Sequence, residues 1–292
     1  MVDTAVHRAF GLDGLDLLMK IARVFPTRTN MSPMDRDAYF GLPGLFASQR
    51  YEEIHVSVAF TWDIERANWL KKQWEMIAPV KIGGPAINGE PTNGFETGKY
   101  LKKGVTITSR GCPNRCPFCF VKQDLIELKD FPEGNIIQDN NILACSGNHL
   151  DKVFQMLSCQ KQINFSGGFE SSRITDQIIE RLRGLSVYQV WLSYDLPDAE
   201  KPLKKAVDKL RKYFRREQLR CYVLIGFHGD TLEKAESRLR RAWEIGTLPF
   251  AMRYRTPQKT WKDSYLFEDK LWSLFTRKWT RPAIIKSRMR VA

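Results

Sequence analysis

Ser109-Arg-Gly-Cys112-Pro-Asn-Arg-Cys116-Pro-Phe-Cys119 is the stretch of this 292-residue chain that decides how the rest is interpreted. Its three cysteines are spaced Cys-x3-Cys-x2-Cys. Three thiolates on one short loop can bind three irons of a cubane cluster and leave the fourth iron open to another ligand. A structural zinc site normally has four protein ligands, and the nearest downstream histidine, His149, lies 30 residues after Cys119. The spacing therefore favours Cys112, Cys116 and Cys119 as ligands of an iron–sulfur cluster.

The other three cysteines, Cys145, Cys159 and Cys221, are scattered along the chain. A secreted disulfide framework would spread its cysteines more evenly through a shorter chain. We expect these three to pack in apolar surroundings, with a catalytic role of Cys145 as a hydrogen-atom donor as the alternative. The chain has no run of 18 apolar residues and no signal-like start, so we expect a cytoplasmic protein with no membrane partner.

Strand and helix patterns alternate from residue 104 onward. Six strand–helix repeats predict an α/β fold, a partial (β/α)6 barrel whose chemistry lies on loops at the carboxyl ends of its strands. Apolar runs and period-3.6 patterns predict strands at 105–108, 135–137 (with 142–144 close by), 162–166, 189–193, 220–226 and 249–254, and helices at 121–128, 148–157, 175–182, 198–214 and 232–245.

A small parallel α/β domain is predicted before the cysteines. Residues 19–25, 53–60 and 80–84 read as strands, and residues 62–77 as a helix, which gives a β-α-β unit. The predicted organisation is thus an N-terminal extension, a small α/β domain, the partial barrel, and a basic, tryptophan-containing tail, over residues 1–18, 19–98, 99–256 and 257–292 respectively.

The motif Cys112-x3-Cys116-x-Phe118-Cys119, directly after a first strand, resembles the defining motif of the radical SAM superfamily. The resemblance extends over about residues 100–256. It implies a [4Fe–4S] cluster on the three cysteines, S-adenosylmethionine on the open iron, and Phe118 beside the cofactor. Such enzymes take one electron, from a donor such as flavodoxin or ferredoxin, and cleave S-adenosylmethionine to methionine and a 5′-deoxyadenosyl radical. The radical then abstracts hydrogen from a substrate.

Two glycines and a glutamate follow the third predicted strand, in Phe165-Ser-Gly167-Gly168-Phe169-Glu170. This segment resembles the family's Gly-Gly-Glu element, which contacts the amino group of S-adenosylmethionine, with one residue inserted before Glu170. Glycines let a ligand approach the backbone closely, and a carboxylate can pair with an ammonium group. The alternative is an ordinary Gly-Gly turn.

Ser193 and Asp195 end the fourth predicted strand and alternate, so both should face the same side. The resemblance implies that they contact ribose hydroxyls or the methionine carboxylate. A helix-capping or turn role for Asp195 is the alternative.

The fifth and sixth predicted strands resemble the adenine-binding part of the family. Ile225 and Gly226 match its Gly-x-Ile-x-Gly element, although Val223 stands at the first glycine. Arg253 lies in the strand with which the family often binds adenine through backbone groups. His228 would lie at the barrel mouth, where it could bind substrate or transfer protons; the alternative is an incidental loop histidine.

The N-terminal domain resembles the end of a cobalamin-binding domain found in one radical SAM branch, through Phe60-Thr-Trp62-Asp63 and Gly83-Gly84-Pro85-Ala86. It is short, and it lacks an Asp-x-His-x-x-Gly element to supply histidine to cobalt. We therefore expect a shortened relative, without cobalamin, that acts as a cap or substrate platform. A cobalamin-dependent methylase without a histidine ligand is the alternative.

The net charge of +13 comes from the C-terminal third, because residues 200–292 hold 24 Lys/Arg and 10 Asp/Glu. This asymmetry favours an anionic partner or substrate, nucleic acid included, although solvated helix faces give the same count. In the tail, Trp261, Trp272 and Trp279 either stack on bases or pack in a helix that closes the barrel. A function of another class, a non-catalytic nucleic-acid-binding protein with a structural metal, would show strongly salt-dependent binding.

Overall fold

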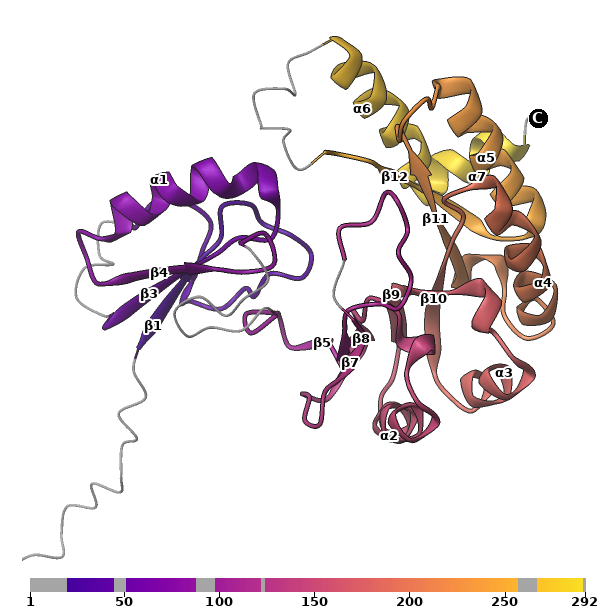
Figure 1. Cartoon of the computed structure of the whole chain (residues 1–292), viewed down its shortest axis with the longest axis horizontal. Coiled ribbons are helices and arrows are strands. Elements are labelled where there is room, and N and C mark those ends of the chain that lie inside the picture. Colours follow the sequence, from indigo (N-terminus) through magenta and orange to yellow (C-terminus); the bar gives the residue numbers. More distant parts are fainter. Residues whose placement is uncertain (1–19, 45–50, 88–97, 122–123, 257–266, 291–292) are drawn as a thin grey trace, which may run out of the picture. The chain divides into compact units, whose positions relative to one another are not determined.

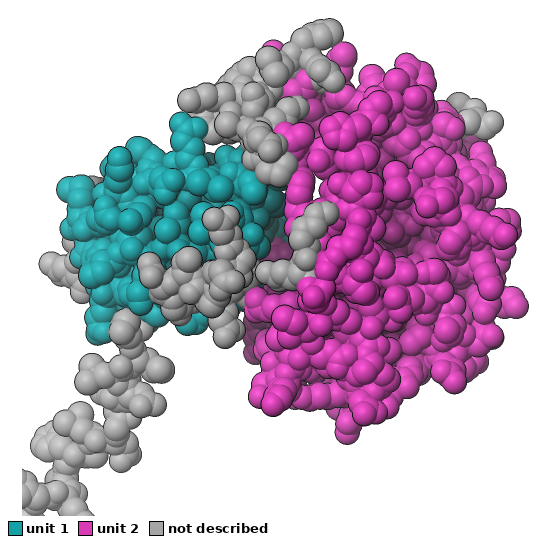
Figure 2. All heavy atoms as spheres, viewed as in Figure 1, with its two compact units in different colours: residues 1–30, 34–100 teal, residues 31–33, 101–292 magenta. Residues whose placement is uncertain are grey.

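The computed structural model describes residues 20–44, 51–87, 98–121, 124–256 and 267–290 (Figure 1). The chain divides into two compact units (Figure 2): Met1–Asn30 with Met34–Tyr100, and Met31–Pro33 with Leu101–Ala292. Each unit contains a parallel β-sheet, which confirms the predicted α/β class. No helix in these described ranges combines the length and the apolar character needed to span a membrane.

The first unit is a four-stranded parallel sheet with the strand order β2-β1-β3-β4. The predicted β-α-β unit is confirmed, because α1 connects β3 to its parallel neighbour β4. Ala67, Leu70 and Trp74 of this helix recur at helical spacing and are fully buried in the unit's core. The elements are β1 (Ile21–Val24), β2 (Ala38–Tyr39), β3 (Glu53–Ser57), η2 (Thr61–Asp63), α1 (Ile64–Trp74) and β4 (Val80–Gly83).

The second unit is built on a six-stranded parallel sheet with the order β12-β11-β10-β9-β8-β5. Its strands are β5 (Gly104–Thr106), β8 (Gly134–Ile137), β9 (Ile163–Phe169), β10 (Val187–Ser193), β11 (Leu219–Ile225) and β12 (Leu248–Arg253). Between them stand α2 (Gly147–Ser158), α3 (Asp176–Arg183), α4 (Glu200–Leu210) and α5 (Leu232–Ile245), with the short helices η4 (Ile142–Ala144), η5 (Ser171–Arg173), η6 (Pro197–Ala199) and η7 (Arg216–Gln218). β5 and β12 are the two ends of the sheet, so the observed architecture is an open parallel sheet with interleaved helices.

The two faces of this sheet differ in composition. Val190 and Leu192 of β10 are fully buried in the core cluster that also holds the apolar residues of α2 to α5. Trp191 and Ser193 alternate with them, so they point to the opposite face, where both are partly exposed. We call this second surface the Trp191 face. By register it also carries Asn164, Arg220, Tyr222 and Phe250.

The helix predicted at residues 121–128 is wrong. Ile126–Glu127 is instead strand β7, paired antiparallel with β6 (Ser109–Arg110). The extended conformation lets the Glu127 carboxylate accept hydrogen bonds from the backbone and hydroxyl of Ser146, at the N-terminus of α2. The first of the six expected repeats therefore has β6 and β7 in place of a helix. Residues 142–144, expected beside the second strand, form the 3-10 helix η4.

The described part of the C-terminal tail forms two helices, α6 (Phe267–Thr280) and α7 (Pro282–Arg290). Trp272 and Trp279 are 8% and 0% exposed and belong to the core of the second unit. Stacking of these two indoles on bases is therefore wrong, and Trp261 lies outside the described residues, as does the extension at 1–18.

Candidate functional site

The cysteine loop, residues 111–120, is fixed at its start by three consecutive side chains that follow β8. The buried Asp139 carboxylate accepts hydrogen bonds from the Thr108 backbone N–H (2.7 Å) and the Ser109 hydroxyl (2.8 Å). The Asn140 side-chain oxygen accepts one from the Gly111 N–H at 3.0 Å. The third residue, Asn141, reaches the loop itself. The end of β8 therefore determines where the loop begins.

His149, considered above as a metal ligand, takes part in the same anchoring. It is buried on α2, and its Nε2 lies 3.1 Å from the Thr108 hydroxyl oxygen. Burial raises the pKa of Asp139, although the hydrogen bonds from Thr108 and Ser109 oppose this. The histidine thus supports the backbone before the cysteines.

Glu170, directly after β9, holds the middle of the cysteine loop. Its carboxylate accepts hydrogen bonds from Asn114 Nδ2 (3.0 Å) and Asn141 Nδ2 (2.7 Å). The Ser172 hydroxyl and Arg173 Nε donate to it as well, each at 2.7 Å. Burial alone would raise its pKa, but these hydrogen bonds lower it to about 2. A carboxylate offers about two acceptor positions on each oxygen. Oε2 accepts three of these hydrogen bonds and Oε1 accepts one, so Oε1 can accept from a further donor.

Gly167 and Gly168 lie inside strand β9, so the alternative of an ordinary Gly-Gly turn is wrong. A Cβ on Gly167 would lie 2.1 Å from the Asp139 carbonyl oxygen. The absence of a side chain therefore lets β9 approach the segment that anchors the loop. Gly168 has a φ of +100°, and a Cβ there would meet no atom within 4 Å. Its backbone borders open space where a ligand can approach.

Asp195 lies beyond the end of β10, close to the central cysteine. Its carboxyl group hydrogen-bonds with the Ser193 side chain and the Leu224 backbone, and burial raises its pKa to about 6. Burial also raises the pKa of the Cys116 thiol, and the charges of Cys119, Cys112 and Asp195 raise it further. The three thiols and one carboxylate therefore lie within electrostatic range of one another. The capping alternative for Asp195 is wrong, because Leu196 and Ala199 are the N-cap residues of η6 and α4.

Aromatic contacts connect the cysteine loop to residues at the opposite edge of the sheet, beyond β11 and β12. The Phe118 ring meets the Phe227 ring edge-on at 6.0 Å between centroids, and Phe120 stacks on Tyr254 at 5.9 Å. Phe227 and Tyr254 follow β11 and β12 and contact each other at 5.0 Å. The exposed His228 lies beside them, 6.3 Å from the Tyr254 ring. A loop that follows edge strand β5 thus meets residues after the two strands at the other edge.

The predicted adenine-side residues have structural partners. The Arg253 guanidinium donates to Asp269 (2.6 Å) and Ser273 (3.1 Å), which holds α6 against β12. The Ile225 side chain is fully buried in the core. Gly226 has a φ of +73°, and its N–H donates to Asp230 at 2.7 Å. The Ile225 carbonyl accepts from the Tyr254 N–H at 2.8 Å, so backbone groups at both positions also have partners within the protein.

Cys145 is separate from the other three thiols. It is 8% exposed, belongs to the hydrophobic core and has a hydrogen bond with the Ser109 side chain. Burial raises its pKa to about 11. The apolar packing expected of Cys145 and Cys221 is confirmed, whereas the same expectation is wrong for Cys159, which is exposed at the end of α2.

All three thiols of the loop are partly buried. Among the residues that the structure describes, no three His, Cys, Asp or Glu side chains are placed to hold one metal ion. Asn141 Nδ2 donates to Cys112 Sγ at 3.5 Å, and the Val121 N–H donates to Cys119 Sγ at 3.4 Å. Such N–H···S bonds are typical around iron–sulfur clusters.

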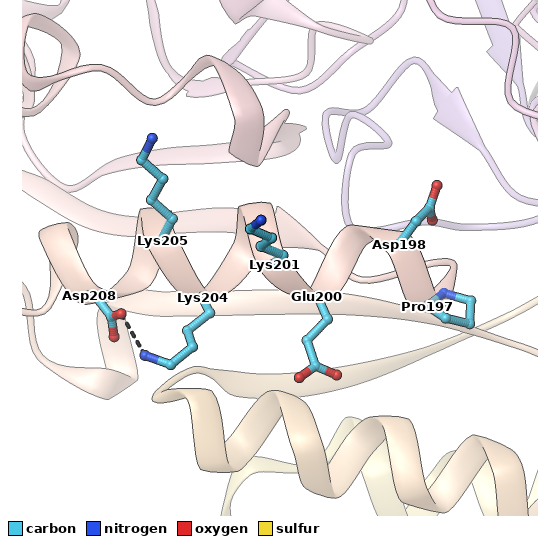
Figure 3. A pocket seen from close by; sticks show the side chains of 7 residues that line it. All are labelled: Pro197, Asp198, Glu200, Lys201, Lys204, Lys205 and Asp208. Carbon is cyan, nitrogen blue, oxygen red and sulfur yellow. Dashed lines mark hydrogen bonds and ion pairs between the residues drawn. The ribbon is translucent and has the colours of Figure 1, made fainter.

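Two other regions lack the features of this site. A hollow along α4 holds none of the predicted site residues, and its Lys204 pairs with Asp208 at 2.6 Å (Figure 3). In the first unit, His55 is 2% exposed and is hydrogen-bonded to Glu53 (2.8 Å) and Tyr100. Its ring is thus already engaged and does not present a ligand for cobalt.

No protein-family model matches the chain, and no curated protein matches it. Sequence reasoning missed the anchors Asn114, Asp139, Asn140 and Asn141. The signal that could have found them is three consecutive hydrogen-bonding residues directly after a predicted strand, at the sheet edge that carries the cysteine motif.

Proposed function

We propose that this protein is a radical SAM enzyme, in which Cys112, Cys116 and Cys119 hold a [4Fe–4S] cluster that binds S-adenosylmethionine. One observation carries the proposal. The cysteine loop contacts residues that follow β8, β9, β11 and β12, and its central thiol lies near Asp195 after β10. In parallel α/β proteins, ligands bind at the carboxyl ends of the strands.

The same contacts support a curved sheet. Phe118 and Phe120 follow edge strand β5 and meet Phe227 and Tyr254, beyond the strands at the opposite edge. A flat six-stranded sheet would hold its edges about 24 Å apart, a distance that a ten-residue loop would cross only in a largely extended conformation. We therefore interpret the unit as a partial (β/α)6 barrel with the cysteines at its mouth.

The residues around the loop receive specific roles. The backbone at Gly168 faces the methionine part of the cofactor, and Ser193 with Asp195 faces the ribose hydroxyls. Glu170 holds the loop through Asn114 with its Oε2, and its Oε1, which accepts from Ser172, would also be open to the methionine ammonium. His228, exposed at the same end, faces the substrate.

When bound, the cluster supplies one electron, drawn from flavodoxin or ferredoxin, for cleavage of S-adenosylmethionine to methionine and a 5′-deoxyadenosyl radical. The chain's own residues orient the reactants and exclude water. Phe118, Phe227 and Tyr254 form an apolar wall beside the thiols. Water exclusion protects a reactive intermediate from side reactions. The reduced cysteines and this chemistry suit a cytoplasmic enzyme.

The test is the formation of 5′-deoxyadenosine. Protein reconstituted anaerobically with iron and sulfide is given dithionite and S-adenosylmethionine, and the nucleoside is measured by mass spectrometry. Cys116→Ala should abolish its formation, whereas Cys159→Ala, an exposed cysteine at the end of α2, should match the unmodified protein. Equal formation by the Cys116→Ala variant would contradict the proposal.

A further inference from the structure

Arg220 is a buried arginine on the Trp191 face of the six-stranded sheet. It is the second residue of β11, and the register pairs it with Trp191 of β10. Tyr222, two residues on, pairs with Ser193 and with Phe250. Arg220 therefore lies about 7 Å further from the carboxyl ends of the strands than Tyr222 does. Only 4% of its surface is exposed.

Two aromatic rings lie beside the guanidinium group, and a third packs against both of them. Its Cζ lies 4.8 Å from the Trp191 ring centroid and 5.9 Å from that of Phe250. Trp191 and Tyr222 stack at 4.3 Å, and Phe250 meets both edge-on at 5.5 and 5.9 Å. The rings hold the arginine in place but provide no negative charge.

Arg220 differs in this respect from two other poorly exposed arginines of the unit. Arg253 pairs with Asp269 at 2.6 Å, and Arg238 pairs with Asp230 at 2.7 Å. Arg220 has neither a hydrogen bond nor an ion pair within the described part of the chain, and its buried Nε has no acceptor. Burial lowers its pKa, and the groups that oppose this are the phenols of Tyr222 and Tyr188.

Burying a cation without a counter-charge is costly. The penalty for removing one ion from water is several kcal/mol in a protein, whereas a cation–π contact returns about 0.5–2 kcal/mol. The rings therefore do not fully offset the cost. The buried, uncompensated cation therefore lowers the stability of the protein without ligand. Such a cost is typical of a binding site whose charge is neutralised by a bound anion.

Further polar atoms on the same face lack partners. Trp191 Nε1 is buried without an acceptor, and Asn164 Oδ1 is buried without a donor. Asn164 pairs in register with Gln189, which alternates with Trp191, so both atoms point to the Trp191 face. Trp191, Tyr222 and Phe250 are each partly exposed, so a ligand can reach these rings, whereas Arg220 lies deeper on the same face.

We propose that Arg220 and Trp191 form a binding site for a small molecule with a carboxylate or phosphate group attached to a planar apolar body. The guanidinium donates two N–H groups to two oxygens of the anion, a geometry that suits arginine. The Trp191 ring lies beside the guanidinium, and the rings of Tyr222 and Phe250 contact the planar body. This site goes beyond the proposed function and does not depend on it.

The test measures anion binding by the full-length protein without iron or S-adenosylmethionine. Benzoate and phenyl phosphate are titrated at constant ionic strength, with benzyl alcohol as the neutral control, and binding is followed by indole fluorescence and the thermal midpoint. At least one anion should bind saturably and benzyl alcohol should not, and comparison of the two anions identifies the preferred group. Arg220→Met should weaken binding at least about tenfold, and Arg220→Lys, which keeps the charge, should lose less.

Arg183→Met is the matched control. Arg183 also lies over a ring, that of Tyr213 at 4.3 Å, but it is exposed and pairs with Glu180 at 2.7 Å. Its substitution should leave the affinity unchanged, and Arg220→Met without ligand should melt no lower than the unmodified protein. Absence of saturable binding, equal affinity of Arg220→Met, or an equal loss in Arg183→Met would each overturn the proposal. None of these results bears on 5′-deoxyadenosine formation, so the two proposals fail separately.

Discussion

The two parallel sheets of this chain end in different ways at their carboxyl edges. In the first unit, backbone groups close the edge: the Val58 N–H donates to Gly83 at 2.8 Å, and the Val58 carbonyl accepts from Ala86 at 3.1 Å. In the second unit, the corresponding edge presents Asp139, Glu170 and Asp195, each bonded to side chains or to the cysteine loop. The comparison shows that a parallel sheet alone does not make a site, because the chemistry lies in the segments attached to it.

Each sheet depends on one glycine at this edge, and substituting them should separate fold from site. A Cβ on Gly167 would meet the Asp139 carbonyl oxygen at 2.1 Å, and one on Gly84 would meet the Val58 oxygen at 2.6 Å. Because both contacts are to backbone, each Gly→Ala change should lower the free energy of unfolding by about 3 kcal/mol. Only Gly167→Ala should also reduce iron binding, since it displaces the anchor of the cysteine loop.

Gly147→Ala is the control for this pair. A Cβ there meets nothing within 4 Å, and the residue begins α2. The substitution should be neutral or stabilise the protein by up to about 1 kcal/mol. Denaturant unfolding and iron content test all three variants. Iron loss in Gly84→Ala equal to that in Gly167→Ala would show that the two edges do not differ as described.

Substitution of Glu170, whose carboxylate holds the cysteine loop, should have an intermediate effect on the free energy of unfolding. The pKa of Glu170 is about 2 in the folded protein, below its value in an unfolded chain. Its contribution is therefore present above about pH 4.5 and is lost as the pH falls toward 2. Glu170→Gln should cost about 2 kcal/mol at pH 7 and almost nothing at pH 2.

Glu180→Gln is the comparison for that measurement, because Glu180 accepts from Arg183 on an exposed helix face. Exposed pairs contribute about 0–1 kcal/mol, so its stability curve should follow that of the unmodified protein. Unfolding in urea from pH 2 to pH 7 gives both curves. If the stability curve of Glu170→Gln ran parallel to that of the unmodified protein at all pH values, Glu170 would not stabilise the cysteine loop through its charge.

Asp195 should give an effect of about the same size as that of Glu170, but of the opposite sign. Burial raises its pKa to about 6, so the folded state favours the protonated form. The unmodified protein therefore loses stability as the pH rises from about 4 through 6. In iron-free protein, Asp195→Asn should be more stable by about 2 kcal/mol at pH 7 and equal at pH 4. A variant less stable at pH 7 would show that the carboxylate is stabilised by its surroundings.

Local signals made much of the fold predictable. The bounds of α5, residues 232–245, were predicted and confirmed, because Thr231 caps the helix (3.3 Å to the Lys234 N–H) and Gly246 ends it at a φ of +116°. The strands follow from short apolar runs, and the positions of the cysteines and glycines follow from the motif.

Contacts between distant residues were not predictable. Asp139 bonds to Thr108 over 31 residues, and Glu170 bonds to Asn114 over 56 residues. β7 is extended because it pairs with β6 and reaches Ser146, neither of which its own sequence indicates. From the sequence alone, Arg220 looks like an ordinary charged residue at the start of a strand. Only the register of β10, β11 and β12 places it beside the rings of Trp191 and Phe250.

The most direct test of the central claim is the metal content of anaerobically reconstituted protein, measured with electron paramagnetic resonance of the dithionite-reduced sample. The account predicts about four irons per chain, a reduced-cluster signal that changes when S-adenosylmethionine is added, and loss of both in Cys116→Ala. A protein that takes up one zinc and no iron, or that keeps its cluster without Cys116, would contradict it.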